Sequence, residues 1–496
     1  MNKINPNTLV LFFIIATVPL LSGATQPLVN GLYLFATLLT AGIWLGLHFE
    51  KVRTHTFPYR SILVLLILVF IVLTTLNLPI QLVKAISPVR AENLVNALQD
   101  GQFINITTSL SYYIPGSRFY AVYGLTLFLF FHFSAALMRS NQNQRIVLWI
   151  ISLIGGLEAV HGIIQLIFPD AGFLRFPVTV SAADFATGTF SDHNHYAAFL
   201  NMCWPISLVL GLTMWKKVFE KMELIQLKNK KISVADRVRL MFDYAAIPFW
   251  CTGLIILSVI LSGSTTGIVV LLALVILCRM VIPFPTFIKI IFSTTIYAAL
   301  LLYGWVLGIQ GITARFSLLL HSAQAKLSFW SDTLAMLKDH PYSGIGMGAF
   351  EFLAPVYVPF HPDNLLLNHA QSDYLELAME LGLPVTLIMF VWLLIGLISY
   401  GRRIFKMPHK LEKITRDEII TVGSFYALAG LAINAVAATV LHTQSITLYA
   451  VLLLAVLHST MVRKKTEENY TPEYLFPQNK PVRFIPYKKP VRRRRR

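Results

Sequence analysis

Charged residues are scarce in this sequence. Only 13% of its 496 residues are Asp, Glu, Lys or Arg, whereas an ordinary soluble domain has roughly a quarter. This scarcity, together with 56% apolar residues, excludes a typical soluble globular fold. Unbroken apolar runs such as Ile62–Leu73 and Val269–Leu277 lie in windows that reach the roughly 20 residues a membrane-spanning helix needs. The composition therefore predicts an all-α polytopic membrane protein.

Cysteine is scarce as well. The three cysteines, Cys203, Cys251 and Cys278, all fall in apolar segments, where we interpret them as small buried side chains and not as a disulfide or metal set. A cleavable signal peptide is also not indicated. The first apolar run follows only Lys3, has no small-residue cleavage site and leads straight into a second run, so it is predicted to be a retained helix.

Acidic residues are few compared with basic ones, and the formal net charge is +17. Such a balance can indicate a nucleic-acid partner. However, residues 463–496 hold 12 of the 41 Lys and Arg residues and three acids, so +9 of the charge belongs to this segment. We therefore expect a basic cytoplasmic tail over 463–496 that contacts the lipid bilayer, and no nucleic-acid partner.

The apolar windows predict about twelve transmembrane helices in a domain that covers residues 1–462. Their approximate ranges are 8–24, 29–48, 61–78, 119–138, 146–168, 195–215, 244–262, 265–282, 288–307, 384–400, 419–441 and 446–462. With both termini in the cytoplasm, 34 of the 41 Lys and Arg residues fall on the cytoplasmic side, which fixes the orientation by the positive-inside rule. The seven outward cations are Lys84, Arg90, Arg118, Arg175, Arg315, Lys326 and Lys338.

Three outward segments exceed the length of a turn: about 79–118, 169–194 and 308–383, the last between helices nine and ten. The chemistry of the protein is expected in these segments. The cytoplasmic insert near 216–243 mixes eight basic with four acidic residues. This mixture is typical of a solvated connector without catalytic content.

The longest outward segment contains a glycine-rich motif, Gly344-Ile345-Gly346-Met347-Gly348-Ala349. The motif has the G-x-G-x-x-A spacing of a dinucleotide fingerprint, but no strand precedes it and no βαβ unit fits in the segment. We interpret the glycines as a tight turn between two short helices. A nest of backbone N–H groups for phosphate oxygens is the alternative.

A second motif in this segment places a histidine among acids, Asn368-His369-Ala370-Gln371-Ser372-Asp373-Tyr374-Leu375-Glu376. His369 could be an ordinary solvated residue near the membrane boundary. Alternatively, an imidazole with an unperturbed pKa near 6.5 could deprotonate a hydroxyl group.

The segment before the sixth predicted helix offers further polar side chains. His193 and His195 next to Asp192 suggest zinc, but a zinc site would need ligands from elsewhere, so no metal is predicted. Within the fifth predicted helix, Glu158 and Gln165 share one face. Charged groups at such depth usually face the bundle interior.

Short motifs follow one another along the chain in a definite order. They are Ser87-Pro88, Glu158 through Gln165, Gly188-Thr189-Phe190, Asn194-His195-Tyr196-Ala197, Trp330, Asp339-His340-Pro341, Gly344-Ile345-Gly346-Met347-Gly348, His369, Asp373-Tyr374-Leu375 and Glu380-Leu381-Gly382. Together they resemble the O-antigen ligase and O-antigen polymerase superfamily, which are bacterial inner-membrane glycosyltransferases with a GT-C-like fold. The resemblance covers most of the chain, with a ligase-like core at about 190–400. It implies a mostly helical periplasmic loop over 308–383.

The resemblance implies transfer of a glycan from undecaprenyl diphosphate to an acceptor hydroxyl at the periplasmic face, with no cofactor and no metal. Among the acceptors known for the superfamily, the resemblance favours lipid A-core. Because a diphosphate leaves without protonation, the enzyme needs a base for the acceptor and cations for the departing charge. His369 matches the family's loop histidine, and we expect Asp373 to orient it and Arg315 to take up the charge. The expected substrate-binding residues are Arg175, Lys326, Arg118, Asn194, His195 and Gln165.

The sequence departs from the family pattern at three positions. Gln371 stands where a second His is common, and Thr265 and Lys326 stand where Arg is common. Lysine cannot form the bidentate phosphate contact of arginine, so the diphosphate is held differently or the donor differs. Repeat-unit polymerases and protein O-oligosaccharyltransferases of the same superfamily remain alternatives.

Two other classes of protein are alternatives to a glycosyltransferase: a secondary transporter with twelve helices and a scaffold of a polysaccharide export complex. A secondary transporter places its long connection centrally and shows similarity between its halves, whereas here the longest loop follows helix nine. A non-catalytic scaffold of a polysaccharide export complex would not need His369. We therefore favour the glycosyltransferase.

Overall fold

The computed structural model describes residues 6–21, 23, 26–55, 59–97, 107–168, 185–227, 233–281, 294, 296–297, 301, 324, 326–358, 369–408 and 413–469. Within these residues the chain is almost entirely helical. The strands found there are β1 (Leu78–Pro79) and β2 (Thr107–Thr108), which pair antiparallel with Leu78 opposite Thr108. The predicted all-α fold is confirmed.

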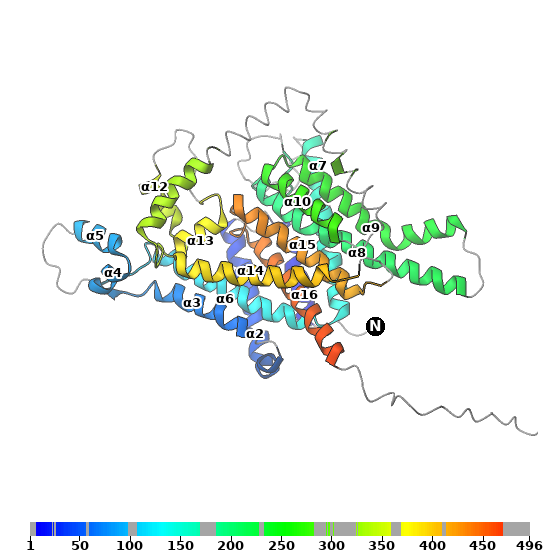
Figure 1. The fold of residues 1–496 in the computed structure, drawn as a ribbon, viewed down its shortest axis with the longest axis horizontal. Coiled ribbons are helices and arrows are strands. Elements are labelled where there is room, and N and C mark those ends of the chain that lie inside the picture. The colour runs from blue at the N-terminus through cyan, green and yellow to red at the C-terminus, as the bar shows by residue number, and fades with distance from the viewer. Residues whose placement is uncertain are drawn as a thin grey trace, which may run out of the picture.

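The helices follow one another along the chain (Figure 1). They are α1 (Pro6–Thr17), α2 (Pro27–His55), α3 (Tyr59–Leu73), α4 (Ile80–Ile86), α5 (Pro88–Ala97), α6 (Ile114–Leu137), α7 (Asn141–Ile167), α8 (His193–Leu227), α9 (Val234–Leu261), α10 (Thr265–Val281), α12 (Phe350–Tyr357), α13 (Asp373–Leu381), α14 (Leu383–Phe405), α15 (Arg416–Ala437) and α16 (Gln444–Asn469). Residues 326–339 are also helical.

Helix α8 lies at the centre of the bundle. Every residue of its most apolar window is buried, and the helix packs against α7, α9, α10 and α15. Close approach is possible because glycines face cysteines: Gly155 of α7 lies against Cys203, and Gly156 lies against Cys251. All three cysteines are buried and none of them forms a disulfide, as the sequence predicts.

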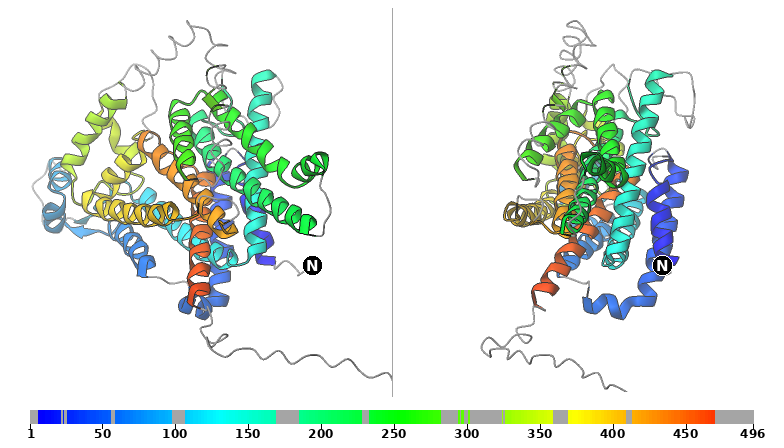
Figure 2. Two further views of the ribbon diagram at one scale, coloured as in Figure 1. Left: turned by 45° about the vertical axis from the view of Figure 1, so that its right-hand side comes forward. Right: turned by 90° about the vertical axis from the view of Figure 1, so that its right-hand side faces the viewer.

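A second group of helices surrounds α6. Helices α2, α3 and α16 pack against it, and α15 contacts α16, which joins the two groups. The right-hand view of Figure 2 shows the N-terminal helices along one edge of the bundle. This arrangement brings the first turns of α6 close to the connection between α15 and α16.

Seven helices are long and apolar enough to cross a membrane, and four shorter apolar helices accompany them among the described residues. These helices coincide with the predicted spans, except that the predicted span 288–307 lies mostly outside the described residues. Helix α14 has none of its most apolar window buried. Because exposed faces with side chains such as Leu387 and Ile395 suit lipid, the chain is a multi-pass membrane protein.

Helical structure extends beyond two predicted boundaries. Helix α8 continues to Leu227 and α9 begins at Val234, so most of the predicted connector 216–243 is helical. Conversely, α3 ends at Leu73, before the predicted end of its span, and the chain then enters β1 at Leu78–Pro79. Proline has no N–H group for a continuing helix.

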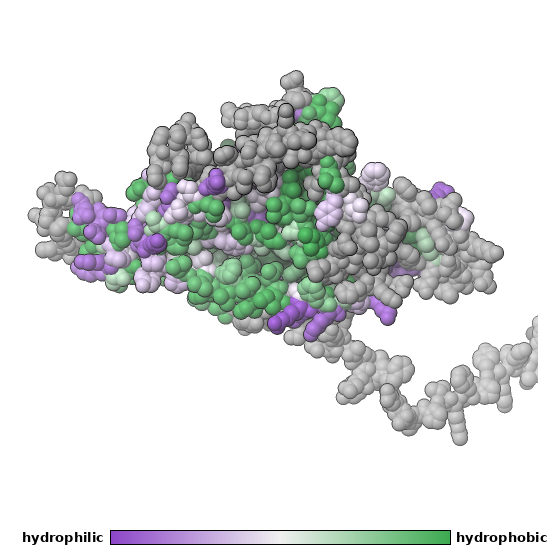
Figure 3. Space-filling model, turned by 45° about the horizontal axis from the view of Figure 1, so that its top comes forward, coloured by the Kyte–Doolittle hydropathy of each residue, from purple (hydrophilic) through white to green (hydrophobic). Residues whose placement is uncertain are grey.

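A small group of elements lies beside one end of the bundle, and we call it the cap: α4, α5, α12, α13 and the helical residues 326–339 (Figure 1). Its larger core contains Met336, Phe350 and Met379. Hydrophilic residues gather over the cap, whereas the middle of the same face is broadly hydrophobic (Figure 3).

A buried histidine, His340, joins α4 and α5 to the rest of the cap. His340 Nδ1 lies 3.1 Å from Ser87 Oγ, and Nε2 lies 3.3 Å from Tyr112 OH. Burial lowers the pKa of His340 to about 4, so the ring is neutral at physiological pH. These contacts give His340 a structural role within the cap.

Candidate functional site

The site is built on the first turn of α13. Ser372 caps this helix by accepting a hydrogen bond from Leu375 N, and Asp373 and Glu376 occupy the first turn, where the helix dipole favours negative charge. Gln371 has a φ of 55°, a left-handed conformation that few non-glycine residues adopt. This reversal brings His369 and Ala370 back over the first turn.

Glu376 holds the returning segment through both of its oxygens. His369 Nδ1 lies 2.9 Å from Oε1, and Ala370 N donates to Oε2 at 2.8 Å. Trp330 Nε1 donates to Ala370 O at 3.1 Å, so the backbone is fixed from both sides. Because the carboxylate accepts a hydrogen bond from Nδ1–H, neutral His369 carries its lone pair on Nε2. The side chain of His369 is 34% exposed, so this nitrogen could accept a proton from a bound molecule.

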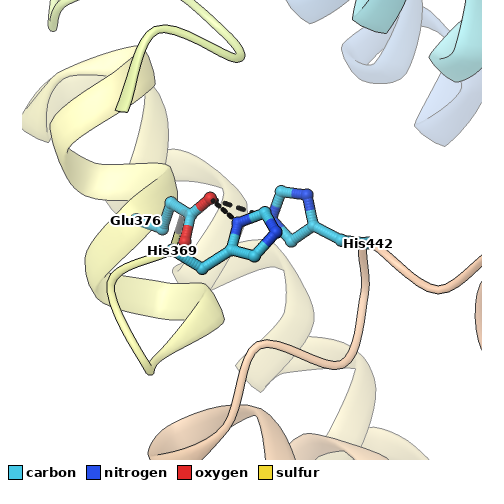
Figure 4. Close-up of side chains that lie close together, drawn as sticks. All are labelled: His369, Glu376 and His442. Atoms are coloured by element: carbon cyan, nitrogen blue, oxygen red, sulfur yellow. Dashed lines mark hydrogen bonds and ion pairs between the residues drawn. The ribbon is translucent and has the colours of Figure 1, made fainter. Parts of the chain in front are cut away.

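A second histidine reaches the same carboxylate from the connection between α15 and α16. His442 Nε2 lies 3.0 Å from Glu376 Oε1, and the two imidazole rings are 4.2 Å apart between centroids (Figure 4). On its other side, His442 Nδ1 lies 2.9 Å from Tyr120 OH of α6. Residues far apart in the sequence therefore meet at one oxygen.

The charges in this cluster depend on one another. Burial alone would raise the pKa of Glu376, but its hydrogen bonds to His369 and His442 outweigh burial and lower the pKa. Burial alone would lower the pKa of His442, but the contact with Glu376 raises it to about 9. At neutral pH the pair consists of a carboxylate and an imidazolium.

Asp373 does not take the position we expected. Its carboxylate accepts hydrogen bonds from Val440 N at 2.9 Å and from Leu441 N at 3.2 Å, whereas the hydrogen bond that orients His369 comes from Glu376. The expectation assumed that the helix begins at His369, but α13 begins at Asp373. Asp373 therefore fixes the segment that carries His442. Burial raises the pKa of Asp373 to about 7.

Two further predicted residues reach the connection between α15 and α16. Lys326 Nζ donates to Ala437 O at 2.7 Å, and His195 Nε2 lies 2.9 Å from Thr439 O. Burial lowers the pKa of Lys326, although the charge of Asp192 opposes this shift. The motifs from three separate segments thus converge on residues 437–443.

The glycine motif forms a tight turn against the end of α13. Gly344, Gly346 and Gly348 have φ values of 64°, 97° and 72°, which glycine adopts without steric cost. Ile345 N donates to Met379 O at 2.9 Å, and Phe350 N donates to Glu380 Oε1 at 3.2 Å. The N–H groups after the turn therefore face an internal carboxylate, and the tight-turn interpretation accounts for the motif.

The remaining predicted site residues are hydrogen-bonded to neighbouring segments, exposed, or outside the described residues. Asn194 Oδ1 accepts a hydrogen bond from Ser264 Oγ at 2.7 Å, and Gln165 Nε2 donates to Gly188 O at 2.6 Å, so both side chains hold neighbouring segments together. Arg118 is exposed on the first turns of α6. Arg175 and Arg315 lie outside the described residues.

The comparison with known families bears on this site directly. Residues 250–390 match the family model described as O-Antigen ligase. The match confirms the resemblance to the O-antigen ligase and polymerase superfamily, and it supports a glycosyltransferase-like enzyme. The O-antigen ligase match includes His369, Glu376 and Lys326, whereas His195 and His442 lie outside it. None of the curated proteins compared matches the chain.

The cluster also has the composition of a metal site. The ligand atoms of His369, Glu376 and His442 lie within 4.8 Å of one another. However, two nitrogens lie 2.9 and 3.0 Å from the same oxygen, whereas ligands of a tetrahedral zinc ion are roughly 3.3 Å apart. The spacing is that of hydrogen bonds, and the absence of a metal requirement stays a prediction. His193 and His195 do not form a pair, because His193 stacks on Phe185 and His195 contacts Thr439.

Sequence reasoning missed Glu376 as the partner of His369, and it missed His442 and Tyr120 entirely. Glu376 belongs to the histidine motif, but it lies seven residues after His369. Its contact with His369 depends on the turn at Gln371, which the sequence alone does not indicate. His442 is a polar residue in a short connection between two apolar helices, which alone does not indicate a partner.

Proposed function

We propose that this protein transfers a glycan from undecaprenyl diphosphate to an acceptor hydroxyl at the periplasmic face of the bacterial inner membrane. We favour lipid A-core as the acceptor. The single observation that carries the proposal is the 2.9 Å contact between His369 Nδ1 and Glu376 Oε1. It leaves Nε2 of a half-buried imidazole as a base, within a segment that matches the O-antigen ligase family.

The chemistry follows from this contact. His369 Nε2 takes the proton of the acceptor hydroxyl while the acceptor oxygen attacks the anomeric carbon. The bond between that carbon and the diphosphate oxygen breaks, and the diphosphate keeps the electron pair. Glu376 stabilises the imidazolium formed on His369, as a carboxylate does behind a catalytic histidine.

Cations must receive the charge that builds on the diphosphate. We propose Arg315 and Arg175 for this role, followed by Lys326 and Arg118. Lys326 is already directed at Ala437, close to the segment that carries His442. For Asn194 and Gln165 we now propose a positioning role, because their polar groups bind Ser264 and Gly188.

The arrangement of helix ends supports a single reaction face. The first turn of α8, the first turns of α6 and the connection between α15 and α16 meet through the pairs His195 with Thr439 and Tyr120 with His442. The opposite ends meet through Arg416 with Asn141 and through Lys216 with Ile414. The charge count assigns the first group of ends to the periplasm and the second group, together with both termini, to the cytoplasm.

The test is transfer by purified protein from a lipid-linked glycan to lipid A-core. His369→Ala should reduce transfer ~100-fold or more, the scale of removing a catalytic proton acceptor, without reducing membrane abundance. His340→Ala is the matched control: it removes a histidine of the cap and should lower stability, but not transfer per folded molecule. Normal transfer by His369→Ala would refute the proposed base.

The product identifies the branch of the superfamily. Glycan attached to lipid A-core supports ligation, whereas elongated glycan on undecaprenyl diphosphate would make the protein a repeat-unit polymerase. Glycan on a protein hydroxyl would make it an oligosaccharyltransferase. Addition of EDTA should leave transfer unchanged, and loss of transfer would contradict a metal-independent reaction.

A further inference from the structure

His442 has no role in the proposed reaction, yet the structure holds it firmly. Both of its nitrogens are engaged, Nε2 with Glu376 Oε1 at 3.0 Å and Nδ1 with Tyr120 OH at 2.9 Å. Its side chain is 19% exposed, compared with 34% for His369. With both nitrogens occupied, His442 is placed to act through Glu376 and not on a substrate.

We propose that His442 is a positioning residue for glycan transfer: its imidazolium shares the Glu376 carboxylate with His369 and thereby keeps His369 neutral, with Nε2 free to accept a proton. This inference rests on the proposed function, in which His369 is the base.

The argument begins with the effect of Glu376 on His369. A carboxylate in contact with one imidazole favours the protonated form of that imidazole. A protonated His369 could not act as a base. The structure places a second ring, that of His442, 4.2 Å from the ring of His369 and on the same oxygen. A positive charge there opposes protonation of His369.

The charge of His442 is consistent with its surroundings. Its contact with Glu376 raises its pKa to about 9, so it is charged at neutral pH. The other titratable groups around the two rings are Asp373 and Glu380 on α13, Tyr120 on α6 and His195 on α8. Burial raises the pKa of Asp373 to about 7 and that of Glu380 to about 8. The carboxylate shared by the two rings is therefore the dominant negative charge.

The backbone that carries His442 is fixed independently of the ring. Asp373 accepts hydrogen bonds from Val440 N and Leu441 N, and Lys326 donates to Ala437 O. The imidazolium is thus held in place before a substrate binds, which is the condition for an electrostatic effect on His369 without reorganisation.

During transfer the proton balance is simple. The acceptor proton moves to His369 Nε2, so Glu376 then lies between two imidazolium rings. The electron pair of the broken glycosidic bond leaves with the diphosphate. His369 returns its proton to water after the product departs, and His442 keeps its own proton throughout.

The pH dependence of transfer tests the inference. His442→Gln keeps a donor for Glu376 but removes the positive charge beside the ring of His369, so the acid limb of kcat/KM should move upward by ~1 pH unit or more. Transfer should then be reduced at neutral pH and recover at higher pH. His340→Gln is the matched control, because it alters a buried histidine of the cap and should leave the limb in place.

A chemical probe gives a second readout that does not need activity. Diethyl pyrocarbonate modifies neutral imidazole, so the rate of modification of His369 at pH 7, measured by mass spectrometry, should fall in His442→Gln. An unchanged rate together with an unmoved acid limb would overturn the inference, even if transfer falls at every pH. Normal transfer by His369→Ala would instead overturn the proposed function, so the two failures are distinguishable.

Discussion

At the scale of single residues, the candidate site depends on one carboxylate. Glu376 receives His369 Nδ1 and His442 Nε2 on Oε1 and Ala370 N on Oε2. Each of these groups is a donor, so the site requires an acceptor at both oxygens. In a glutamine at this position, the amide NH2 group would face one of these N–H donors and could not accept its hydrogen bond. The identity of this side chain is therefore constrained by geometry as well as by charge.

Glu380 is a second buried carboxylate with a different role. Burial, together with the charge of Glu376, raises its pKa from 4.5 to about 8. The folded chain then keeps a proton that the unfolded chain releases, so Glu380 costs stability as the pH rises from about 4.5 to about 8. Its contact with Phe350 N requires only one acceptor oxygen, which an amide also provides.

We expect Glu380→Gln to remove this pH-dependent loss. The thermal midpoint of the variant should exceed that of the wild type by an amount that widens between pH 5 and pH 8, measured in detergent by differential scanning fluorimetry. Glu351→Gln, at an exposed position on α12, is the control and should show no widening. A constant difference across this range would mean that Glu380 is ionised in the folded protein.

At the scale of elements, the first turn of α13 organises two segments at once. Glu376 holds the preceding turn, and Asp373 holds the connection between α15 and α16. Helix α13 begins at Asp373 because Ser372 caps it and Gln371 adopts the left-handed conformation. Two carboxylates one helical turn apart thus position two histidines that are distant in the sequence.

Asp373→Ala should loosen the connection that carries His442. The change leaves Val440 N and Leu441 N without their acceptor, and an unsatisfied buried donor costs roughly 1–3 kcal/mol. We expect a lower thermal midpoint and reduced transfer, with a smaller effect for Asp373→Asn, which retains one acceptor oxygen. Asp332→Ala in the helical residues 326–339 is the control. Equal effects of the alanine and asparagine variants would indicate that the charge matters more than the hydrogen bonds.

The helices could be predicted from the sequence, whereas the site could be predicted only in part. Apolar windows locate membrane helices because lipid requires long uninterrupted runs, and His369 stands in a recognisable motif. The spacing of four residues favours Asp373 as the partner of His369, but only if one continuous helix contains both residues. The turn at Gln371 places Glu376 there instead. His442 could not be found, since its position depends on how α15 and α16 pack beside α13.

At the scale of the whole molecule, the bundle gathers polar groups at one end of apolar helices. Residues 437–443 receive contacts from α6, α8, α13 and the helical residues 326–339. In the predicted topology α6 and α8 come directly after long outward segments, whereas α13 and the helical residues 326–339 lie within the longest one. The same packing that buries α8 therefore brings segments from both sides of the family match together.

The orientation of this end is the last prediction. The positive-inside count assigns it to the periplasm, so a cysteine at exposed Lys338 should react with a membrane-impermeant maleimide in cells whose outer membrane alone is permeable. A cysteine at exposed Gln142, near the contact between Arg416 and Asn141, should react only after the inner membrane is opened. The native cysteines are buried and should not interfere. Labelling in the reverse order would place the His369 cluster in the cytoplasm, away from the proposed acceptor, and would leave the glycan transfer reaction without its site.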